Sequence, residues 1–350
     1  MRVLIVDDSP VLRMLLRTVL ESEGFEVREA GSGEQALRLL EGYQPDIITM
    51  DVHMPGMDGY EATACILELH ALPVVIVTAS ADANAAATAI YALEAGALAV
   101  LDKPVGPDAE NFEQLVAELL RTLRRMAEVK IVRRPRTVRG HAVAPFKAPV
   151  SSGSPRLVAI AASAGGPAAL KSMLAGLASN QPWPLLLAQH IAVGFLGSFR
   201  DWLVTVCKLP VSVAEHGQVL QSGRLYLAPD GQHLGLGNDL RVCLQPRNSE
   251  LYCPSADHLF RSVAQRLGSE AIGIQLSGMG RDGAEGLAEL HRAGALTIAQ
   301  EPASALIDSM PLAAIKLHAA RQVLPPAAIA ALLNTIASLG AACSAQPEGE

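Results

Sequence analysis

Three aspartates stand directly after two short apolar runs near the N-terminus. Asp7 and Asp8 follow the run Val3–Val6, and Asp51 follows the run Asp46–Met50. If both runs are parallel strands of one sheet, their carboxyl ends share an edge and the three carboxylates converge. Such a cluster is costly unless a cation neutralises it. Hard oxygen ligands suit Mg²⁺, which keeps several waters and accepts a phosphate oxygen.

Two more strand ends in the same region supply a hydroxyl and an ammonium. Thr78 follows the apolar run Pro73–Val77, and Lys103 follows Ala99–Leu101. Together they could hold the oxygens of an acyl phosphate formed on Asp51. Taken singly, a strand-end Asp is usually a helix cap or turn residue, and a Lys before Pro is usually solvated. Five such residues at the strand ends favour a phosphoryl-accepting site.

A serine lies where a nucleophile could be presented. The segment LVAIAASAGGPAAL (157–170) places Ser163 at the end of a strand, with a glycine pair next and Pro167 opening a helix. A helix N-terminus favours the negative charge of an oxyanion. A Gly-Gly turn can also bind a nucleotide phosphate, and a Ser there can be a simple N-cap. Ala161 also breaks the G-x-S-x-G pattern. The segment alone leaves these alternatives open.

A base and an acid follow at two other strand ends. His190 comes after the run Pro184–Gln189, and Asp282 lies in the glycine-rich loop 277–286 after Ala271–Leu276. A histidine can take and return a proton near neutral pH, and a carboxylate can orient it. Asp282 could instead cap the following helix, and most lone histidines are structural. The shared sheet edge favours a serine hydrolase, with backbone N–H groups of the loop as possible oxyanion donors.

Strand–helix alternation must position both groups of residues, and it occurs twice in the 350 residues. We expect one α/β domain over 1–125 and a second over 155–343, each with a mostly parallel sheet. The stretch 126–154 between them is basic and rich in Pro, Ser and Gly, which is typical of a linker. The last residues, Ala342–Glu350, are expected to be a frayed tail.

Composition excludes some classes of protein. Half of the residues are hydrophobic, 18% are charged, and the net charge is −7, which argues against a nucleic-acid binder. The 5 cysteines include no CxxC pair, which favours a reducing, cytoplasmic setting. The N-terminus does not have the pattern of a signal peptide, and no run approaches the ~20 apolar residues that span a bilayer. We therefore expect no direct membrane insertion.

The first half resembles the response-regulator receiver family. The matching pieces are VDDSP (6–10), MDVHMPGMDG (50–59), VTAS (77–80) and LDKP (101–104). The resemblance implies a flavodoxin-like fold and phosphorylation of Asp51 by a partner histidine kinase. It implies Mg²⁺ held by Asp8 and Asp51, with Asp7 assisting and the His53 carbonyl as a further ligand, and phosphoryl sensing by Thr78 and Lys103. Val100 departs from the aromatic residue that many receivers carry there.

The second half resembles the chemotaxis protein-glutamate methylesterase family (CheB). The matching segments are AIAASAGGPAAL (159–170), AQHIAVGFLGSF (188–199), YLAPDGQHL (226–234), CPSADHLFRSVA (253–264), LSGMGRDGAEG (276–286) and AQEPASALIDSMP (299–311). The resemblance implies a doubly wound α/β fold with Ser163, His190 and Asp282 as the triad and the Met279 N–H at the oxyanion. It implies demethylation and deamidation of chemoreceptors. Ala164 departs from the Thr that members often carry after the nucleophile.

The resemblance also implies regulation, in which the unphosphorylated receiver covers the hydrolase cleft and phosphorylation of Asp51 releases it. Three other functions compete with this one. A receiver with a DNA-binding output predicts a basic helix-turn-helix in the second half. A non-catalytic adaptor would keep its function after Ser163→Ala. A nucleotide-binding domain would use the Gly165–Gly166 turn, and a thermal shift with nucleotide would reveal it.

Overall fold

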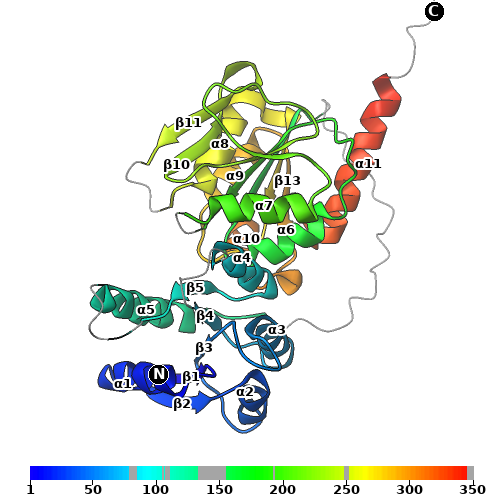
Figure 1. The fold of residues 1–350 in the computed structure, drawn as a ribbon. Coiled ribbons are helices and arrows are strands. Elements are labelled where there is room, and N and C mark those ends of the chain that lie inside the picture. The colour runs from blue at the N-terminus through cyan, green and yellow to red at the C-terminus, as the bar shows by residue number, and fades with distance from the viewer. Residues whose placement is uncertain are drawn as a thin grey trace, which may run out of the picture. The chain divides into compact units, whose positions relative to one another are not determined.

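The computed structural model describes residues 1–78, 85–104, 106, 111–132, 155–191, 194–247 and 252–344, with only the backbone described at 85–89 and 341–344. The chain divides into two compact units, Met1–Thr137 and Val138–Glu350 (Figure 1). Most of the expected linker lies outside the described residues. The domain limits 1–125, 126–154 and 155–343 therefore stay predictions.

The first unit alternates strands and helices along the whole of its described length. Its elements are β1 (Arg2–Val6), α1 (Pro10–Ser22), β2 (Glu26–Ala30), α2 (Gly33–Leu40), β3 (Ile47–Met50), α3 (Gly59–Leu69), β4 (Val74–Thr78), α4 (Ala85–Ala95), β5 (Ala99–Asp102) and α5 (Phe112–Ala127). Each strand pairs in parallel with its neighbours, in the order β2-β1-β3-β4-β5. This is the strand order of the flavodoxin-like fold that was expected.

Helices cover both faces of this sheet because its central strands are apolar on both sides. Alternate residues of a strand point to opposite faces. Val3 and Ile5 of β1 therefore pack with α1 and α5, in a core that includes Leu16 and Leu119. The intervening residues of the sheet pack with α2, α3 and α4 in a second core. This arrangement leaves the carboxyl ends of the strands as the edge where polar side chains can gather.

The second unit is built around a larger sheet. Its strands are β6 (Leu157–Ala162), β7 (Leu185–Gln189), β8 (Val211–Val213), β9 (Leu225–Leu227), β10 (Gln232–Leu236), β11 (Val242–Pro246), β12 (Ala271–Gln275), β13 (Leu296–Gln300) and β14 (Gln322–Leu324). Its α-helices are α6 (Gly166–Leu174), α7 (Leu196–Val206), α8 (Ala256–Leu267), α9 (Ala284–Arg292), α10 (Ser309–Lys316) and α11 (Pro326–Ser344). Short 3-10 turns span Asn238–Leu240, Gly268–Glu270 and Pro302–Ser304.

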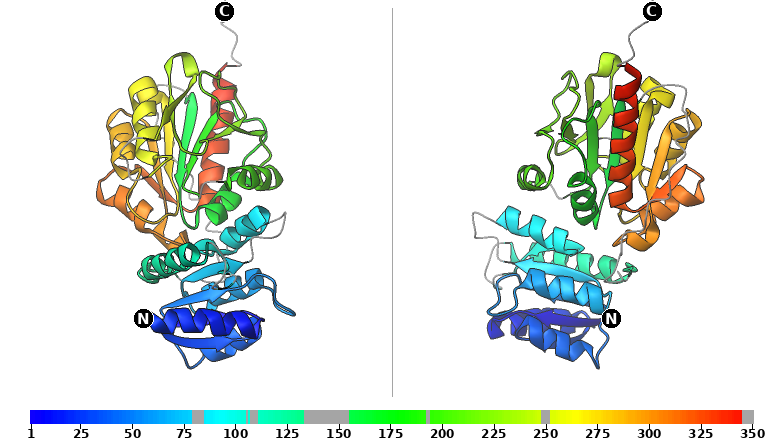
Figure 2. Two further views of the ribbon diagram at one scale, coloured as in Figure 1. Left: turned by 60° about the vertical axis from the view of Figure 1, so that its left-hand side comes forward. Right: turned by 90° about the vertical axis from the view of Figure 1, so that its right-hand side faces the viewer.

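Seven of these strands form a parallel sheet in the order β14-β13-β12-β6-β7-β9-β8. Strands β10 and β11 form a separate antiparallel hairpin. One face of the large sheet packs with α8, α9 and α10, and Figure 2 shows α11 running along the opposite side of this unit. The doubly wound, mostly parallel α/β fold expected for this half is confirmed. Among the described residues, no helix is long and apolar enough to cross a bilayer.

Two features near the C-terminus differ from the sequence-based predictions. The strand β14 was not predicted, since it has only three residues, its apolar Val323 is exposed, and the sequence carries no clear alternation. The tail was expected to begin at Ala342, but α11 extends to Ser344. The first three residues of the expected tail, 342–344, are therefore helical, because an alanine-rich sequence continues the helix. The rest of that tail lies outside the described residues.

Candidate functional sites

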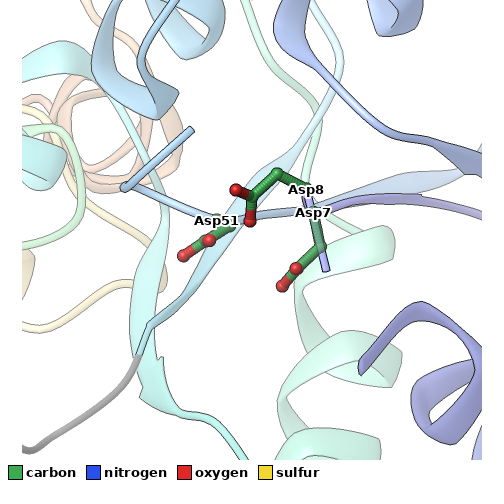
Figure 3. Close-up of side chains that lie close together, drawn as sticks. All are labelled: Asp7, Asp8 and Asp51. Carbon is green, nitrogen blue, oxygen red and sulfur yellow. The ribbon is translucent and has the colours of Figure 1, made fainter. Parts of the chain in front are cut away.

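The three aspartates of the first unit converge at one edge of its sheet. Asp7 and Asp8 follow β1, and Asp51 follows β3, which pairs with β1. Carboxylate oxygens of the three lie within 4.8 Å of one another (Figure 3). Asp7 and Asp51 are buried, whereas Asp8 is exposed to solvent. The cluster expected from the sequence is therefore present in the structure, with one side open.

Lys103 joins two of these aspartates. Its Nζ lies 2.9 Å from Oδ2 of Asp7 and 2.8 Å from Oδ2 of Asp51, and its side chain is buried. Burial raises the pKa of Asp51 above its ordinary value, because the opposing attraction of Lys103 does not fully offset desolvation and Asp7 repels its charge. Burial alone would lower the pKa of Lys103, but its bonds to Asp51 and Asp7 outweigh that effect and raise it. Lys103 therefore stays charged.

Thr78 and His53 complete the set predicted from the sequence. Thr78 is the last residue of β4 and is 3% exposed. Its Oγ1 is buried and has no hydrogen-bond partner among the described residues, so it can still bind an oxygen of a group attached nearby. His53 lies two residues after Asp51 in the loop before α3. The role of its carbonyl as a metal ligand stays a prediction. Val100 is a half-buried residue of β5 opposite Ile76.

In the second unit, Ser163 follows β6 at a sharp turn into α6. Gly165 has φ of +76°, a conformation that costs glycine little. A side chain at this position would also collide with Ser277 and Leu306. The Ser163 N–H donates to the Ser277 carbonyl at 3.0 Å, and the Gly166 N–H donates to the Ser163 carbonyl at 2.8 Å. These contacts hold the serine at the N-terminal end of the helix, as the glycine pair predicted.

His190 follows β7, the strand beside β6. The two strands pair with Ala162 opposite Gln189, so Ser163 and His190 occupy the next position of the same register. Nε2 of His190 lies 2.9 Å from Oδ2 of Asp282. Its Nδ1 is buried and has no hydrogen-bond partner among the described residues. Because Asp282 engages Nε2, Nδ1 is the nitrogen left to exchange a proton with a reacting group.

Asp282 accepts hydrogen bonds from other groups besides His190. Its two oxygens also accept hydrogen bonds from the Ser255 hydroxyl at 3.2 Å and from the backbone N–H groups of Ala256 at 2.7 Å and Asp257 at 3.1 Å. Burial favours the neutral acid, but these bonds and His190 outweigh it and hold the pKa of Asp282 below its ordinary value. The carboxylate therefore stays ionised. The sequence left open whether Asp282 caps the helix that follows it. Asp282 instead accepts from the first two N–H groups of α8, whose N-cap residue is Ser255.

The predicted oxyanion donor, the Met279 N–H, lies in the loop after β12. The N–H groups on either side of Met279 are both used: that of Gly278 donates to Ile307 at 3.1 Å, and that of Gly280 donates to Ser309 Oγ at 3.0 Å. Within the described part of the chain, no group accepts a hydrogen bond from the Met279 N–H. An unpaired N–H between two anchored neighbours suits an oxyanion. The role itself stays a prediction.

Two strand-end glutamines support this arrangement, and sequence reasoning overlooked them. Nε2 of Gln189 donates to the carbonyls of Ser163 and His190, both at 2.9 Å. Nε2 of Gln275 donates to the Asp282 carbonyl at 2.8 Å. Both side chains are buried. The signal was available, since each is a single polar residue closing an otherwise apolar strand, and a buried amide needs partners.

Comparison with known proteins agrees with both units. A family model described as response regulator receiver domain matches residues 3–116, and one described as CheB methylesterase matches residues 158–333. Fold and sites define a two-unit α/β protein with a receiver-type acidic edge and a hydrolase-type His–Asp pair. The chain belongs to the CheB methylesterase family, in the form that carries a receiver domain.

Similar proteins cover nearly the whole chain. A protein of Hahella chejuensis named protein-glutamate methylesterase/protein-glutamine glutaminase 3 is 50% identical over 96% of this chain and 98% of its own. A protein of the same name from Anaeromyxobacter dehalogenans is 45% identical over 94% and 97%. The crystal structure of the Thermotoga maritima CheB methylesterase catalytic domain covers 53% of this chain and 100% of its own, with a TM-score of 0.50 and 30% identity.

Proposed function

We propose that this chain is a protein-glutamate methylesterase and protein-glutamine glutaminase that acts on methyl-accepting chemotaxis receptors and is activated by phosphorylation of Asp51. The observation that carries the proposal is the contact of His190 with Asp282 at the sheet edge where Ser163 also lies. The names of the relatives supply the reaction, and their similarity extends across both units.

In the proposed reaction, the Ser163 hydroxyl attacks the γ-carbonyl of a glutamyl methyl ester. Nδ1 of His190 takes the hydroxyl proton and returns it to the leaving methoxide, which departs as methanol. The ionised Asp282 stabilises the imidazolium that forms between these transfers. The Met279 N–H donates to the oxyanion.

Water then attacks the acyl-enzyme with His190 again as the base, and a receptor glutamate is released. A glutamine substrate passes through the same acyl-enzyme, with ammonia as the leaving group. A serine hydroxyl is weakly nucleophilic without a base, so both reactions begin with proton transfer to His190.

The receiver edge is proposed to accept a phosphoryl group from a partner histidine kinase. Asp51 would be the acceptor, and Lys103 and Thr78 would bind the oxygens of the acyl phosphate. Among the described residues, three carboxylates share one ammonium, so the cluster carries an excess negative charge that fits a divalent cation. Asp8 and Asp51 would hold Mg²⁺, with Asp7 assisting and the His53 carbonyl as a further ligand. Mg²⁺ there would neutralise the charge of the incoming phosphoryl oxygens.

The proposal includes a switch and a location. In the unphosphorylated protein the receiver hinders access of the receptor to Ser163, and phosphorylation shifts the population toward the open arrangement. We place the protein in the cytoplasm, where it would meet the kinase and the receptors, and assign it no nucleic-acid partner and no insertion into the bilayer.

The test is methanol release from methylated receptor membranes, measured with and without a small phosphodonor such as acetyl phosphate. We expect release by the wild type, stimulation by the phosphodonor, and no release by Ser163→Ala. Asp51→Asn is expected to keep the basal rate and lose the stimulation. Absence of release by the wild type in every condition would contradict the esterase assignment. Equal stimulation of Asp51→Asn and wild type would contradict the switch.

A further inference from the structure

Tyr252 lies flat against the ring of His190. The two ring centroids are 4.7 Å apart and the ring planes differ by 3°. Tyr252 is half-buried and lies outside the strand ends that carry the predicted triad. Three residues further on, Ser255 contacts Asp282 through its hydroxyl. One short segment before α8 therefore touches both members of the His–Asp pair.

The contact with Tyr252 restricts a motion of the His190 ring that the hydrogen bond to Asp282 does not restrict. A hydrogen bond at Nε2 fixes the position of that atom, but the imidazole ring can still tilt about it. The direction of Nδ1 depends on this tilt, and proton transfer requires Nδ1 to point at the reacting hydroxyl. A second aromatic ring in parallel contact restricts the tilt.

The other end of Tyr252 reaches the glycine-rich loop. A Cβ added at Gly280 would lie 3.0 Å from the Tyr252 hydroxyl oxygen, so the bare glycine leaves room for the tyrosine. Gly280 directly follows Met279, the predicted oxyanion donor. The tyrosine therefore contacts the base on one side and approaches the loop of the oxyanion donor on the other.

We infer that Tyr252 is a positioning residue of the hydrolase site, whose ring holds the His190 imidazole in the plane that presents Nδ1 to Ser163. This inference rests on the proposed function for its reaction. It assigns Tyr252 no contact with the substrate and no proton transfer of its own. The aromatic ring of Tyr252 positions His190, and the Tyr252 hydroxyl is not needed for this role.

The experiment compares Tyr252→Leu with Tyr252→Phe in the full chain. Methanol release from methylated receptor membranes gives kcat and KM. The rate at which a fluorophosphonate probe labels Ser163, displacing fluoride, gives a second readout that needs no receptor. Tyr91→Leu makes the same exchange at an exposed tyrosine of the first unit and is the matched control. Thermal unfolding checks each fold, and Tyr252→Met repeats the test with more apolar volume if the leucine variant melts early.

For Tyr252→Leu we expect kcat and the labelling rate to fall about 10- to 100-fold with KM within about twofold of wild type, since alignment of the base is lost. Tyr252→Phe should stay within about threefold of wild type, because the stacked ring remains. Tyr91→Leu should match wild type. Wild-type rates for Tyr252→Leu would overturn the inference. So would a raised KM with unchanged kcat, which indicates substrate contact, or a loss in Tyr252→Phe as large as in Tyr252→Leu.

Labelling separates this inference from the proposed function. If the wild type labels at Ser163 but releases no methanol, the receptor assignment fails while the labelling rates still decide the role of Tyr252. If the wild type does neither, the serine is not activated and both statements fail.

Discussion

Asp51 and Asp282 are both buried carboxyls, yet their surroundings shift their pKa values in opposite directions. Asp282 meets two backbone N–H groups, a hydroxyl and a histidine, all of which favour the anion. Asp51 meets one ammonium, one backbone N–H, that of Val52, and a neighbouring carboxylate of like charge. The first environment suits a fixed negative charge beside a base. The second suits a carboxylate that is to be neutralised by a cation or modified by a phosphoryl group.

Replacement of Asp282 by Asn should affect both catalysis and the pH dependence of stability. The folded pKa of Asp282 lies below its unfolded value, so its bonds add to the free energy of unfolding above about pH 5 and are lost as pH falls below about 4. Denaturant unfolding of wild type and Asp282→Asn should therefore differ most near neutral pH and converge in acid. A constant difference across this range would contradict the assignment. In the methanol assay, kcat should fall by about 100-fold or more, since the histidine loses its anionic partner.

Replacement of Lys103 by Met should uncouple the receiver without harming the esterase. Without the ammonium, Asp7 and Asp51 lose the cation that both contact, and with it a group proposed to bind a phosphoryl oxygen. We expect the basal rate of methanol release to remain and the stimulation by acetyl phosphate to disappear. Arg38→Met, on α2 of the same unit, is the control and should keep the stimulation. Normal stimulation of Lys103→Met would show that the ion pairs have no part in the switch.

At the scale of elements, both sites are made by the carboxyl ends of neighbouring parallel strands, and buried polar side chains at those ends tie the loops together. Gln189 closes β7 and binds the carbonyls of the residues after β6 and β7. Gln275 closes β12 and binds the loop that carries Asp282. The positions of the serine and the acid therefore depend on amides within the sheet, as well as on the turns that follow it.

Gln189→Leu should lower both stability and rate. The change leaves the His190 carbonyl without this donor and the Ser163 carbonyl with the Gly166 N–H alone, and one unpaired buried group costs about 1–3 kcal/mol. Urea unfolding should show that loss, and labelling of Ser163 by a fluorophosphonate should slow. Gln265→Leu makes the same exchange at an exposed position of α8 and should change the free energy of unfolding by less than about 0.5 kcal/mol. Equal unfolding curves for both variants would refute the role of Gln189.

The sequence predicted the strands and the polar residues at their ends because those signals are local. Apolar runs such as Leu157–Ala162 are buried on both faces, and the next residue must then lie at the sheet edge. The support of Asp282 by Ser255 and the stacking of Tyr252 on His190 are different. Both depend on a segment without periodicity, 252–255, whose place is set by the packing of α8 against the sheet. No local pattern carries that information.

At the scale of the whole molecule, each unit has its own parallel sheet and its own cores. Among the described residues, the contacts observed for the receiver edge and for the His–Asp pair each join residues of one unit. The proposed control of one by the other therefore acts on access to a complete hydrolase site rather than on its assembly.

The segment 155–350 expressed alone should then be active and insensitive to phosphodonor. We expect its methanol release to exceed the basal rate of the unphosphorylated full chain, because the proposed hindrance by the receiver is removed. The rate at which a small fluorophosphonate labels Ser163 should be the same in the segment and in the full chain, since the probe is much smaller than a receptor. A segment slower than the full chain in both assays would show that the receiver helps to build the site.

The hydrogen bonds that the first amides of α8 donate to Asp282 can report on the state of the hydrolase site. The amides of Ala256 and Asp257 donate to the carboxylate that also holds His190. Their exchange with deuterium should be slow while they are hydrogen-bonded to that carboxylate and fast when those bonds are broken. Two backbone protons can thus reveal, in the resting protein and without any substrate, how often the Asp282 carboxylate breaks its hydrogen bonds to α8.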